Sequence, residues 1–270
     1  MEPISIVVLN YNGKEVLAAC LDSIFKGLEP PYEVIVLDNA STDDSLKVCE
    51  RFPVRIEYGD NRFQFVGGLN DAFRYAKYQS VLFVSNDVCF QWDGIRQLRL
   101  LLESVPKSII QPLFLWPDGS VQHAGMKLYW PMYGLAETKV PEEPFYTTSV
   151  FATACFMMRK DTFKEVGEFD VALAPGHYED VDYSLRADKL SIPLLVYPYA
   201  KVYHIGAHSF NKVYGKRGIS AIAARNREYL VRKHFKGWDK WSRLLAIRAI
   251  RLASSGRSGR HNSLAQGLSG

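Results

Sequence analysis

The chain has 270 residues, of which 47% are hydrophobic, 13% aromatic and 23% charged. This is the composition of an ordinary globular protein, and it excludes a disordered, collagen-like or coiled-coil chain; we expect one large domain, or one domain with an elaborated end. No uncharged apolar run approaches the roughly 20 residues that cross a bilayer, so we expect no membrane-spanning helix.

The start of the chain and its cysteines indicate a compartment. Met1-Glu2-Pro3 carries no basic charge, and the apolar run 4–9 is too short for a secretion signal. We therefore expect a cytoplasmic protein, peripheral on the inner leaflet of the cell membrane if it binds lipid. The four cysteines stand far apart with no C-x-x-C pair, so neither a disulfide framework nor a zinc ribbon is expected.

Positive charge is concentrated near the end of the chain. The net charge is +4, yet residues 212–261 contain 14 Lys and Arg against two acids, Glu228 and Asp239. That segment carries +12 and the remainder −8. One end of the molecule is therefore suited to an anionic partner.

The first hundred residues alternate β-rich runs with segments of helical periodicity. Strands are predicted at 4–9, 33–37, 55–58 and 81–84. Helices are predicted up to Lys26, from a cap at Ser41 or Thr42, and over 67–78. The alternation predicts an α/β fold with a doubly wound, mostly parallel central sheet flanked by helices.

From about residue 106 the alternation fades into sequence rich in proline, glycine and aromatic residues. Predicted strands and helices follow at 122–129, 151–159, 161–166, 179–189, 194–197, 201–204 and 220–252, and the last 18 residues read as a mobile tail. We divide the chain into a first half (1–105), a second half of the same domain (106–219) and a basic helical C-terminal extension (220–270).

Polar side chains follow three of the predicted strands, at the edge where open α/β sheets bind ligands. They are Asn10, Asp38 and Asp87. Asp38 suits a hydrogen bond from a nucleobase or ribose, or else caps the next helix. Asp87 suits Mg²⁺ or Mn²⁺ beside a diphosphate, or else is a turn residue.

Three further motifs have both a chemical and a structural interpretation. Gly67-Gly68 would let backbone approach a phosphate at a helix N-terminus, or form a turn. The acids from Glu179 to Asp182 include a possible general base, although acids also favour a helix N-terminus. His204 and His208 could ligate metal or be structural.

The order of these motifs resembles that of family 2 glycosyltransferases with the GT-A (Rossmann-like) fold. The rhamnosyltransferase-like members, which assemble bacterial cell-surface polysaccharides, are most similar in character, and their Arg-Asn pair is matched by Arg225-Asn226. The resemblance covers residues 4–235. It rests on the segments Ile4 to Gly13, Leu37 to Asp43, Gly67 to Asn70, Ser85 to Asp87, Gly167 to Asp170, Glu179 to Asp182 and His204 to Ser209.

The resemblance implies that residues 1–105 are a nucleotide-sugar-binding half and that residues 106–219 are the acceptor-binding and catalytic half of the same domain. Asn10 and Tyr11 would line the nucleoside pocket, and Asp38 would bind a pyrimidine base. Asn70 would face the nucleotide or the donor sugar. Asn86 would also contact the donor nucleotide.

The resemblance also implies a metal and a base. Asp87 occupies the last position of the family's D-x-D metal motif, where Ser85 replaces the first carboxylate, and His204 would complete the metal or diphosphate site. Asp180 would be the catalytic base. Glu179 beside it would aid acceptor binding.

We therefore interpret the sequence as an inverting, metal-dependent glycosyltransferase. It would move a sugar from a UDP or dTDP donor to a hydroxyl of a cell-surface glycan or lipid-linked acceptor. Two alternatives stay open: a sugar-1-phosphate nucleotidyltransferase, and a non-catalytic glycan-assembly scaffold. Nucleic acid is not an expected partner, because nothing in the chain suggests base readout.

The C-terminal segment 238–252 has an amphipathic pattern. On a helical wheel one arc holds Trp238, Trp241, Leu245, Ala249 and Leu252, and the opposite side holds Lys240, Arg243, Arg248 and Arg251. Such a helix either lies on an anionic membrane surface or docks its tryptophan face on the catalytic domain.

Overall fold

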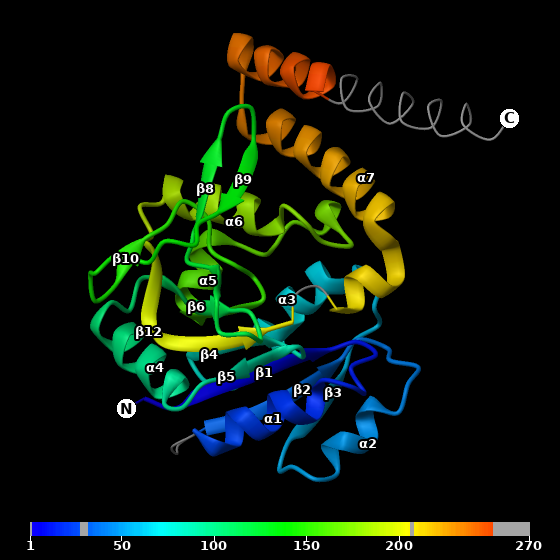
Figure 1. Ribbon diagram of the computed structural model, residues 1–270, viewed down its shortest axis with the longest axis vertical. Coiled ribbons are helices and arrows are strands. Elements are labelled where there is room, and N and C mark those ends of the chain that lie inside the picture. Colours follow the sequence, from blue (N-terminus) through cyan, green and yellow to red (C-terminus); the bar gives the residue numbers. More distant parts are fainter. Residues whose placement is uncertain (1, 28–31, 206–207, 251–270) are drawn as a thin grey trace, which may run out of the picture.

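The computed structural model describes residues 2–27, 32–205 and 208–250 (Figure 1). The strands are β1 (Ile4–Asn10), β2 (Tyr32–Asp38), β3 (Arg55–Tyr58), β4 (Ser80–Ser85), β5 (Val88–Phe90), β6 (Ile109–Leu115), β7 (Val121–His123), β8 (Met126–Tyr129), β9 (Tyr133–Ala136), β10 (Tyr146–Thr147), β11 (Cys155–Arg159) and β12 (Leu194–His204). The helices are α1 (Leu17–Lys26), α2 (Ser45–Cys49), α3 (Gln64–Tyr75), α4 (Gly94–Ser104), α5 (Lys160–Val166), the 3₁₀ turn η1 (Val171–Leu173), α6 (Glu179–Lys189), α7 (His208–His234) and a helix over residues 237–250.

One large mixed sheet organises the molecule. Its strand order is β10-β12-β6-β11-β4-β1-β2-β3, with β5 on β12 and β7 on β6. The neighbours β3, β2, β1 and β4 are parallel, as are β6 and β12. Between these two groups β11 runs antiparallel to both β4 and β6. The predicted α/β fold with a mostly parallel central sheet is confirmed.

The alternation of side chains along β1 explains the two layers of helices. Ile4, Ile6 and Val8 point into a core shared with α1 and α4, whereas Val7 and Leu9 point into a second core shared with α3, α5 and α6. All of β1 is buried, as expected of a central parallel strand with helices on both faces. Figure 1 shows these helices on opposite sides of the sheet.

The C-terminal helices form a third layer. Leu230 and Val231 of α7, with Leu244 and Ile247 of the helix over 237–250, share a small core with Met132. Figure 1 shows α7 rising along the domain to the tip of the β8–β9 hairpin, where the last helix crosses. Within the described ranges, no helix has the length and apolar character needed to cross a membrane.

Several predicted boundaries were wrong. The helix predicted over 67–78 is α3, which begins at Gln64 and ends at Tyr75, so Gly67 and Gly68 lie inside it. A Cβ on Gly68 would come 2.5 Å from Leu9 Cδ1. Gly68 therefore lets the helix pack closely on β1, which is a packing role and not a phosphate-binding one.

The predicted helix caps and the C-terminal helix also differ. The helix after β2 begins at Ser45, with Asp44 at its N-cap, so neither Ser41 nor Thr42 caps it. The continuous helix predicted from residue 220 is instead α7, which runs from His208 to His234 with a kink at Gly215, where φ is 59°. A break at 235–236 and the helix over 237–250 follow. The predicted tail and Arg251 and Leu252 lie outside the described residues.

Candidate active site

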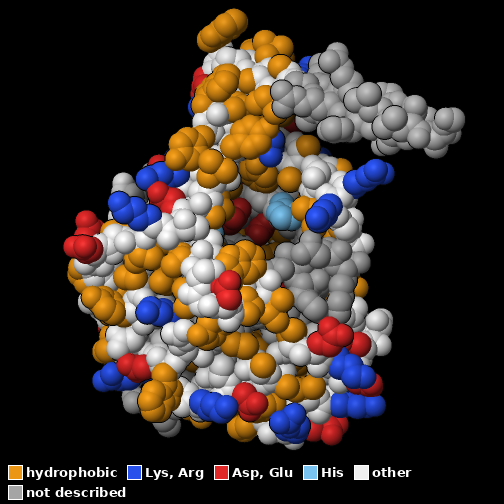
Figure 2. Space-filling view, viewed as in Figure 1, with side chains coloured by type: hydrophobic (Ala, Val, Ile, Leu, Met, Phe, Trp, Pro, Cys, Tyr) orange, Lys and Arg blue, Asp and Glu red, His pale blue; other side chains and the backbone are white. Residues whose placement is uncertain are grey.

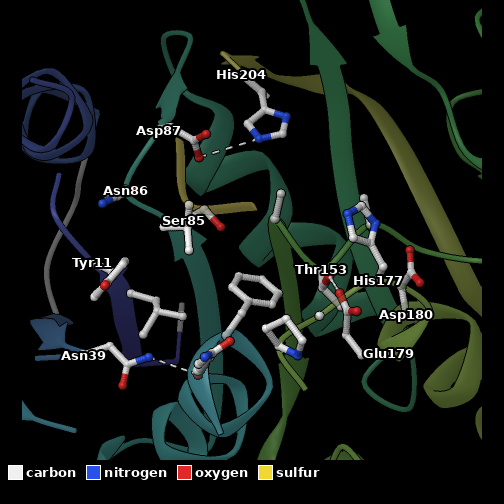
Figure 3. Close-up of a pocket in the computed structure, with 18 of the residues that line it drawn as sticks. Tyr11, Asn39, Ser85, Asn86, Asp87, Thr153, His177, Glu179, Asp180 and His204 are labelled. Carbon is white, nitrogen blue, oxygen red and sulfur yellow. Dashed lines mark hydrogen bonds and ion pairs between the residues drawn. The ribbon is translucent and has the colours of Figure 1, made fainter. Parts of the chain in front are cut away.

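A pocket of about 370 Å³ lies at the carboxyl ends of the parallel strands (Figure 3). Its walls come from the ends of β1, β4 and β12 and from the start of α6. Figure 2 shows a hollow in this face of the molecule with acidic and histidine side chains inside it. This is the edge at which an open α/β sheet is expected to bind its ligand.

Six predicted site residues meet in this pocket. They are Tyr11, Asn86, Asp87, Glu179, Asp180 and His204. In Figure 3, Tyr11 lies on one side, Glu179 and Asp180 lie on another, and Asp87 and His204 form a third group. Residues separated by more than 190 positions in the sequence are therefore brought to one cavity.

Asn10 and Asp38 lie outside the pocket lining, in a buried network behind it. Asn10 Nδ2 donates to Asp38 Oδ1 at 3.0 Å and to Ser45 Oγ at 2.9 Å, and Asn10 Oδ1 accepts from Asn86 Nδ2 at 2.9 Å. Asp38 Oδ2 accepts from the backbone N–H of Ser41 at 3.1 Å. Both side chains thus fix the loops that carry pocket residues; their direct contact with a nucleoside stays a prediction.

Gly13 is required by this network. A Cβ at this position would lie 2.3 Å from both Asn10 Oδ1 and Asn86 Nδ2. The turn after β1 therefore passes close above the Asn10–Asn86 hydrogen bond, and a larger residue would separate the two amides.

Asn70 also lies outside the pocket lining. Its amide makes a pair of hydrogen bonds with the Phe169 backbone: Nδ2 to the carbonyl at 3.0 Å, and the N–H to Oδ1 at 2.7 Å. The side chain is 7% exposed. Asn70 thus ties α3 to the segment before η1, and the predicted contact with a donor sugar is untested.

Asp87 and His204 lie next to each other in the lining of the pocket (Figure 3). His204 Nε2 lies 3.6 Å from Asp87 Oδ1. Gln122 orients the ring: its Nε2 donates to the His204 carbonyl at 3.3 Å, which leaves its Oε1 to accept from His204 Nδ1 at 2.8 Å. Because the Gln122 Oε1 can only accept, Nδ1 carries a proton, and Nε2 is the ring nitrogen that faces Asp87.

This pair fits a hard cation that takes most of its ligands from a bound diphosphate. Carboxylate oxygen and neutral imidazole are suitable donors, and Mg²⁺ in particular is held by one or two carboxylates plus phosphates. Within the described ranges, no group of three or more His, Cys, Asp or Glu side chains forms a complete protein cage. Ser85 in place of a first carboxylate agrees with that sparse donor set.

Glu179 and Asp180 present carboxyl groups on the other side of the pocket. Burial, and then the neighbouring Glu179 carboxylate, raises the pKa of Asp180 to about 8. Burial raises the pKa of Glu179. Glu179 Oε1 accepts from Thr153 Oγ1 at 2.8 Å, while Oε2 is buried with no hydrogen-bond partner among the described residues. A buried, unsatisfied carboxylate oxygen facing a pocket is suited to a ligand hydroxyl.

The start of α6 is held in an uncommon backbone conformation. His177 and Tyr178 both have positive φ, 66° and 75°, which side-chain-bearing residues rarely adopt. Asn226 of α7, fully buried, donates to the carbonyls of Leu173, Gly176 and His177 at 2.9, 2.9 and 2.7 Å. α7 therefore supports the loop that aims Glu179 and Asp180 into the pocket.

Sequence reasoning missed several pocket residues. Thr153 and His123 line it, and burial lowers the pKa of His123 to about 4, so the ring is neutral. Gln64 and Tyr214 are joined by a 2.5 Å hydrogen bond at its edge. Thr153, His123 and Tyr214 lie in no recognisable motif, and the position of Gln64 shortly before Gly67-Gly68 does not by itself predict a pocket contact. Only the juxtaposition in the fold identifies these residues.

Comparison with known proteins identifies relatives. Residues 5–167, more than half of the chain, match glycosyl transferase family 2. Rhamnosyltransferase WbbL of Escherichia coli is 20% identical over 90% of this chain and 98% of its own length. The low-salt glycan biosynthesis hexosyltransferase Agl10 of Haloferax volcanii is 22% identical over 71% of this chain and 64% of its own.

A poly(ribitol-phosphate) beta-glucosyltransferase of Bacillus spizizenii is 36% identical over 31% of this chain and 14% of its own length. The chain thus spans less than two thirds of the length of two of these relatives. Among solved structures, GalNAc-T7 with UDP, GalNAc and Mn²⁺ has a TM-score of 0.66 at 19% identity, covering 76% of this chain and 43% of that one. The structure of Staphylococcus aureus TarS has a TM-score of 0.60 at 16% sequence identity, covering 89% of this chain and 41% of that one.

The two structural likenesses show a GT-A fold. The family match runs from β1 through β11 and so includes the strand ends that carry Tyr11, Asn86 and Asp87. With more than half of its sequence matched, this chain belongs to glycosyl transferase family 2.

Proposed function

We propose that this protein transfers a sugar from a nucleoside diphosphate donor to an acceptor hydroxyl, with inversion at the anomeric carbon. The observation that carries the proposal is the pairing, in one pocket, of the Asp87–His204 group with Asp180, a carboxyl whose pKa is raised to about 8. The first group suits a diphosphate site, and the second suits a base that works near neutral pH.

The reaction follows from these positions. Ionised Asp180 takes the proton of the acceptor hydroxyl, whose oxygen forms a bond to the anomeric carbon. On the opposite face the bond from that carbon to the diphosphate breaks, and its electron pair stays on the departing diphosphate oxygen. A single displacement inverts the configuration. Glu179, whose Oε2 has no hydrogen-bond partner in the described part of the chain, would accept a hydrogen bond from a second acceptor hydroxyl and orient the acceptor.

A divalent cation, Mg²⁺ or Mn²⁺, would be held by Asp87 and His204. When bound, it would neutralise charge on the leaving diphosphate. Tyr11, directly after β1, and Asn86, before β5, line the pocket and would contact the nucleoside side of the donor. The structurally similar GalNAc-T7 was crystallised with UDP and Mn²⁺, which supports a donor and cation of this class.

The acceptor is proposed to be a cell-surface glycan or a lipid-linked precursor of one. Support comes from the names of the relatives, which include a glycan biosynthesis hexosyltransferase, a poly(ribitol-phosphate) glucosyltransferase and a rhamnosyltransferase. Family membership favours sugar transfer over the nucleotidyltransferase and the non-catalytic scaffold considered from the sequence.

Asp180→Asn tests the proposal. A donor is first identified by thermal shift with a panel of UDP and dTDP sugars, with and without Mn²⁺. The variant should lose about 10²- to 10⁴-fold in transfer while keeping the wild-type Kd for that donor, because the base acts on the acceptor. Asp188→Asn, on the exposed end of the same helix, is the matched control and should transfer normally. Transfer by Asp180→Asn near the wild-type rate would reject Asp180 as the base.

A further inference from the structure

The helix over residues 237–250 has two apolar faces, and only one of them packs on the described part of the protein. Leu244 and Ile247 are 2% and 3% exposed in the small C-terminal core, whereas Trp238 and Trp241 are 81% and 53% exposed. The helix therefore docks on the domain, but it does so through Leu244 and Ile247. The tryptophan face predicted from the sequence stays on the outside.

The tip of the β8–β9 hairpin, which contacts this helix, carries further exposed apolar side chains. Arg243 Nη1 donates to the carbonyl of Pro131 at the hairpin tip at 3.2 Å, and Met132 shares the core with Leu244. Figure 2 shows apolar side chains gathered at this end of the molecule. We call the exposed apolar side chains of the two elements the aromatic ridge: Tyr129, Trp130, Leu135, Trp238, Trp241, Leu245 and Ile250.

Basic side chains accompany the ridge. Residues 236–250 carry Lys236, Lys240, Arg243 and Arg248 against a single acid, Asp239, which accepts a 2.9 Å hydrogen bond from Arg243 Nε. Exposed tryptophan with flanking positive charge is the composition that binds the headgroup region of anionic bilayers. We propose that the aromatic ridge binds the surface of an anionic phospholipid membrane.

The hairpin connects this surface to the pocket. Met126, at the start of β8, lines the pocket, and Trp130 follows four residues later at the tip. At about 3.4 Å per residue, β8 spans about 14 Å. Membrane binding through Trp130 would thus hold the Met126 side of the pocket within about this distance of the lipid, which suits a sugar carried on a lipid. This consequence rests on the proposed function, whereas membrane binding itself does not.

Vesicle flotation of the full chain tests the proposal without donor or acceptor. At low salt the protein should float with vesicles of phosphatidylcholine and phosphatidylglycerol, and not with phosphatidylcholine alone. The double variant Trp238→Ser, Trp241→Ser should bind at least tenfold less, because it removes two aromatic side chains that would enter the headgroup region. Trp92→Ser, at a residue 90% exposed beside β5, is the matched control and should float like the wild type.

Charge is tested separately. Lys236→Glu with Arg248→Glu should reduce binding to the anionic vesicles by about tenfold or more, because it reverses two positive charges near the anionic surface. The control Lys47→Glu, on α2, should leave binding to these vesicles unchanged. Wild-type protein that stays at the bottom of the gradient would overturn the proposal. So would undiminished flotation of the tryptophan variant, or a dimer in solution that this variant dissociates, which would assign the ridge to a second copy. Circular dichroism confirms that each variant is folded.

Discussion

The environment of Asp180 predicts the pH dependence of transfer. Its folded-state pKa of about 8 lies above the usual aspartate value of about 3.9, so the carboxyl is mostly protonated at pH 7 and a base must be ionised. We expect kcat/KM to rise by about tenfold per pH unit below pH 8 and to level off above it. Initial rates between pH 6 and pH 9.5 provide the measurement.

The rise of kcat/KM with pH should come from the ionisation of Asp180. If the residual activity of Asp180→Asn keeps the same rising limb, the titrating group lies elsewhere. A wild-type kcat/KM profile that is flat between pH 6 and pH 8 would contradict the prediction, because kcat/KM follows the ionisation of the free enzyme.

Asp87 predicts a metal-dependent effect on donor binding. Asp87→Ala removes the carboxylate opposite His204 Nε2, so with Mn²⁺ we expect affinity for UDP or dTDP to fall by about tenfold or more. With EDTA the variant and the wild type should bind equally. Calorimetry measures both. Asp118→Ala, exposed in the loop between β6 and β7, controls for loss of charge; equal losses with and without metal would make Asp87 a structural residue.

Strand-end position was sufficient to identify some polar side chains as pocket residues and not others. Asp87 and Asp38 each follow a buried apolar strand, yet only Asp87 lines the pocket. Asp38 instead accepts hydrogen bonds from Asn10 and the Ser41 backbone. The sequence cannot show which of the two carboxylates lines the pocket, because this depends on whether neighbouring donors in the fold already hydrogen-bond to the carboxylate. Asn70 shows the same effect with Phe169.

At the scale of elements, α6 was the most predictable. Its observed bounds, Glu179–Lys189, are those predicted, with acids in the first turn and bases in the last. One of those acids, Asp182, is fully buried and binds α7: His234 Nε2 lies 2.7 Å and Lys233 Nζ 2.8 Å from its Oδ1. Arg186 Nε lies 2.9 Å from Oδ2. Asp182 is therefore a structural acid, distinct from Asp180.

Asp182→Asn should destabilise the fold. Removing one partner of a buried charge cluster costs about 3 kcal/mol, because Lys233 and His234 keep their positions without the compensating carboxylate. Urea unfolding at pH 7 measures this as a lower midpoint. The control is Asp161→Asn, whose exposed pair with Lys164 at 3.7 Å should contribute little. A change no larger than that of the control would contradict the structural role.

The sign of the pH effect follows from the pKa of Asp182. Burial alone would raise that pKa, but hydrogen bonds from His234 and Lys233 and the charge of Arg186 lower it to about 2. The unfolded value is about 3.9, so the stabilisation is present above pH 4 and is lost as the pH falls toward 2. The difference between wild type and Asp182→Asn should therefore shrink below pH 4.

Elements in the second half were harder to predict. β6 was missed because Gln111 and Pro112 interrupt its apolar run, although every residue from Ile109 to Leu115 is buried. Gln111 is tolerated there because its Oε1 accepts from the Ala152 backbone at 2.8 Å. Short strands such as β5 and β7 carry too few residues to show a period. Their pairing is decided by β12 and β6, which are distant in sequence.

At the scale of the whole molecule, the two halves of the chain supply different parts of one pocket. Tyr11, Asn86 and Asp87 come from the first half, and Glu179, Asp180 and His204 come from the second. The proposed division of labour between donor and acceptor follows this order along the chain except at His204, which lies beside Asp87 in the proposed diphosphate site. The sequence predicted both sets, but only the fold shows that they face a common cavity.

Because the antiparallel strand β11 pairs with strands from both halves of the chain, the two halves cannot be exchanged independently between relatives. It pairs with β4 from residues 155–159 and with β6 on its other edge, so a chimaera joined near residue 105 must rebuild the β4–β11 register as well as the linker. Exchanging halves between relatives is therefore a poor way to change acceptor preference. Grafting loops at the pocket rim, such as residues 175–178 before α6, leaves the sheet pairing intact.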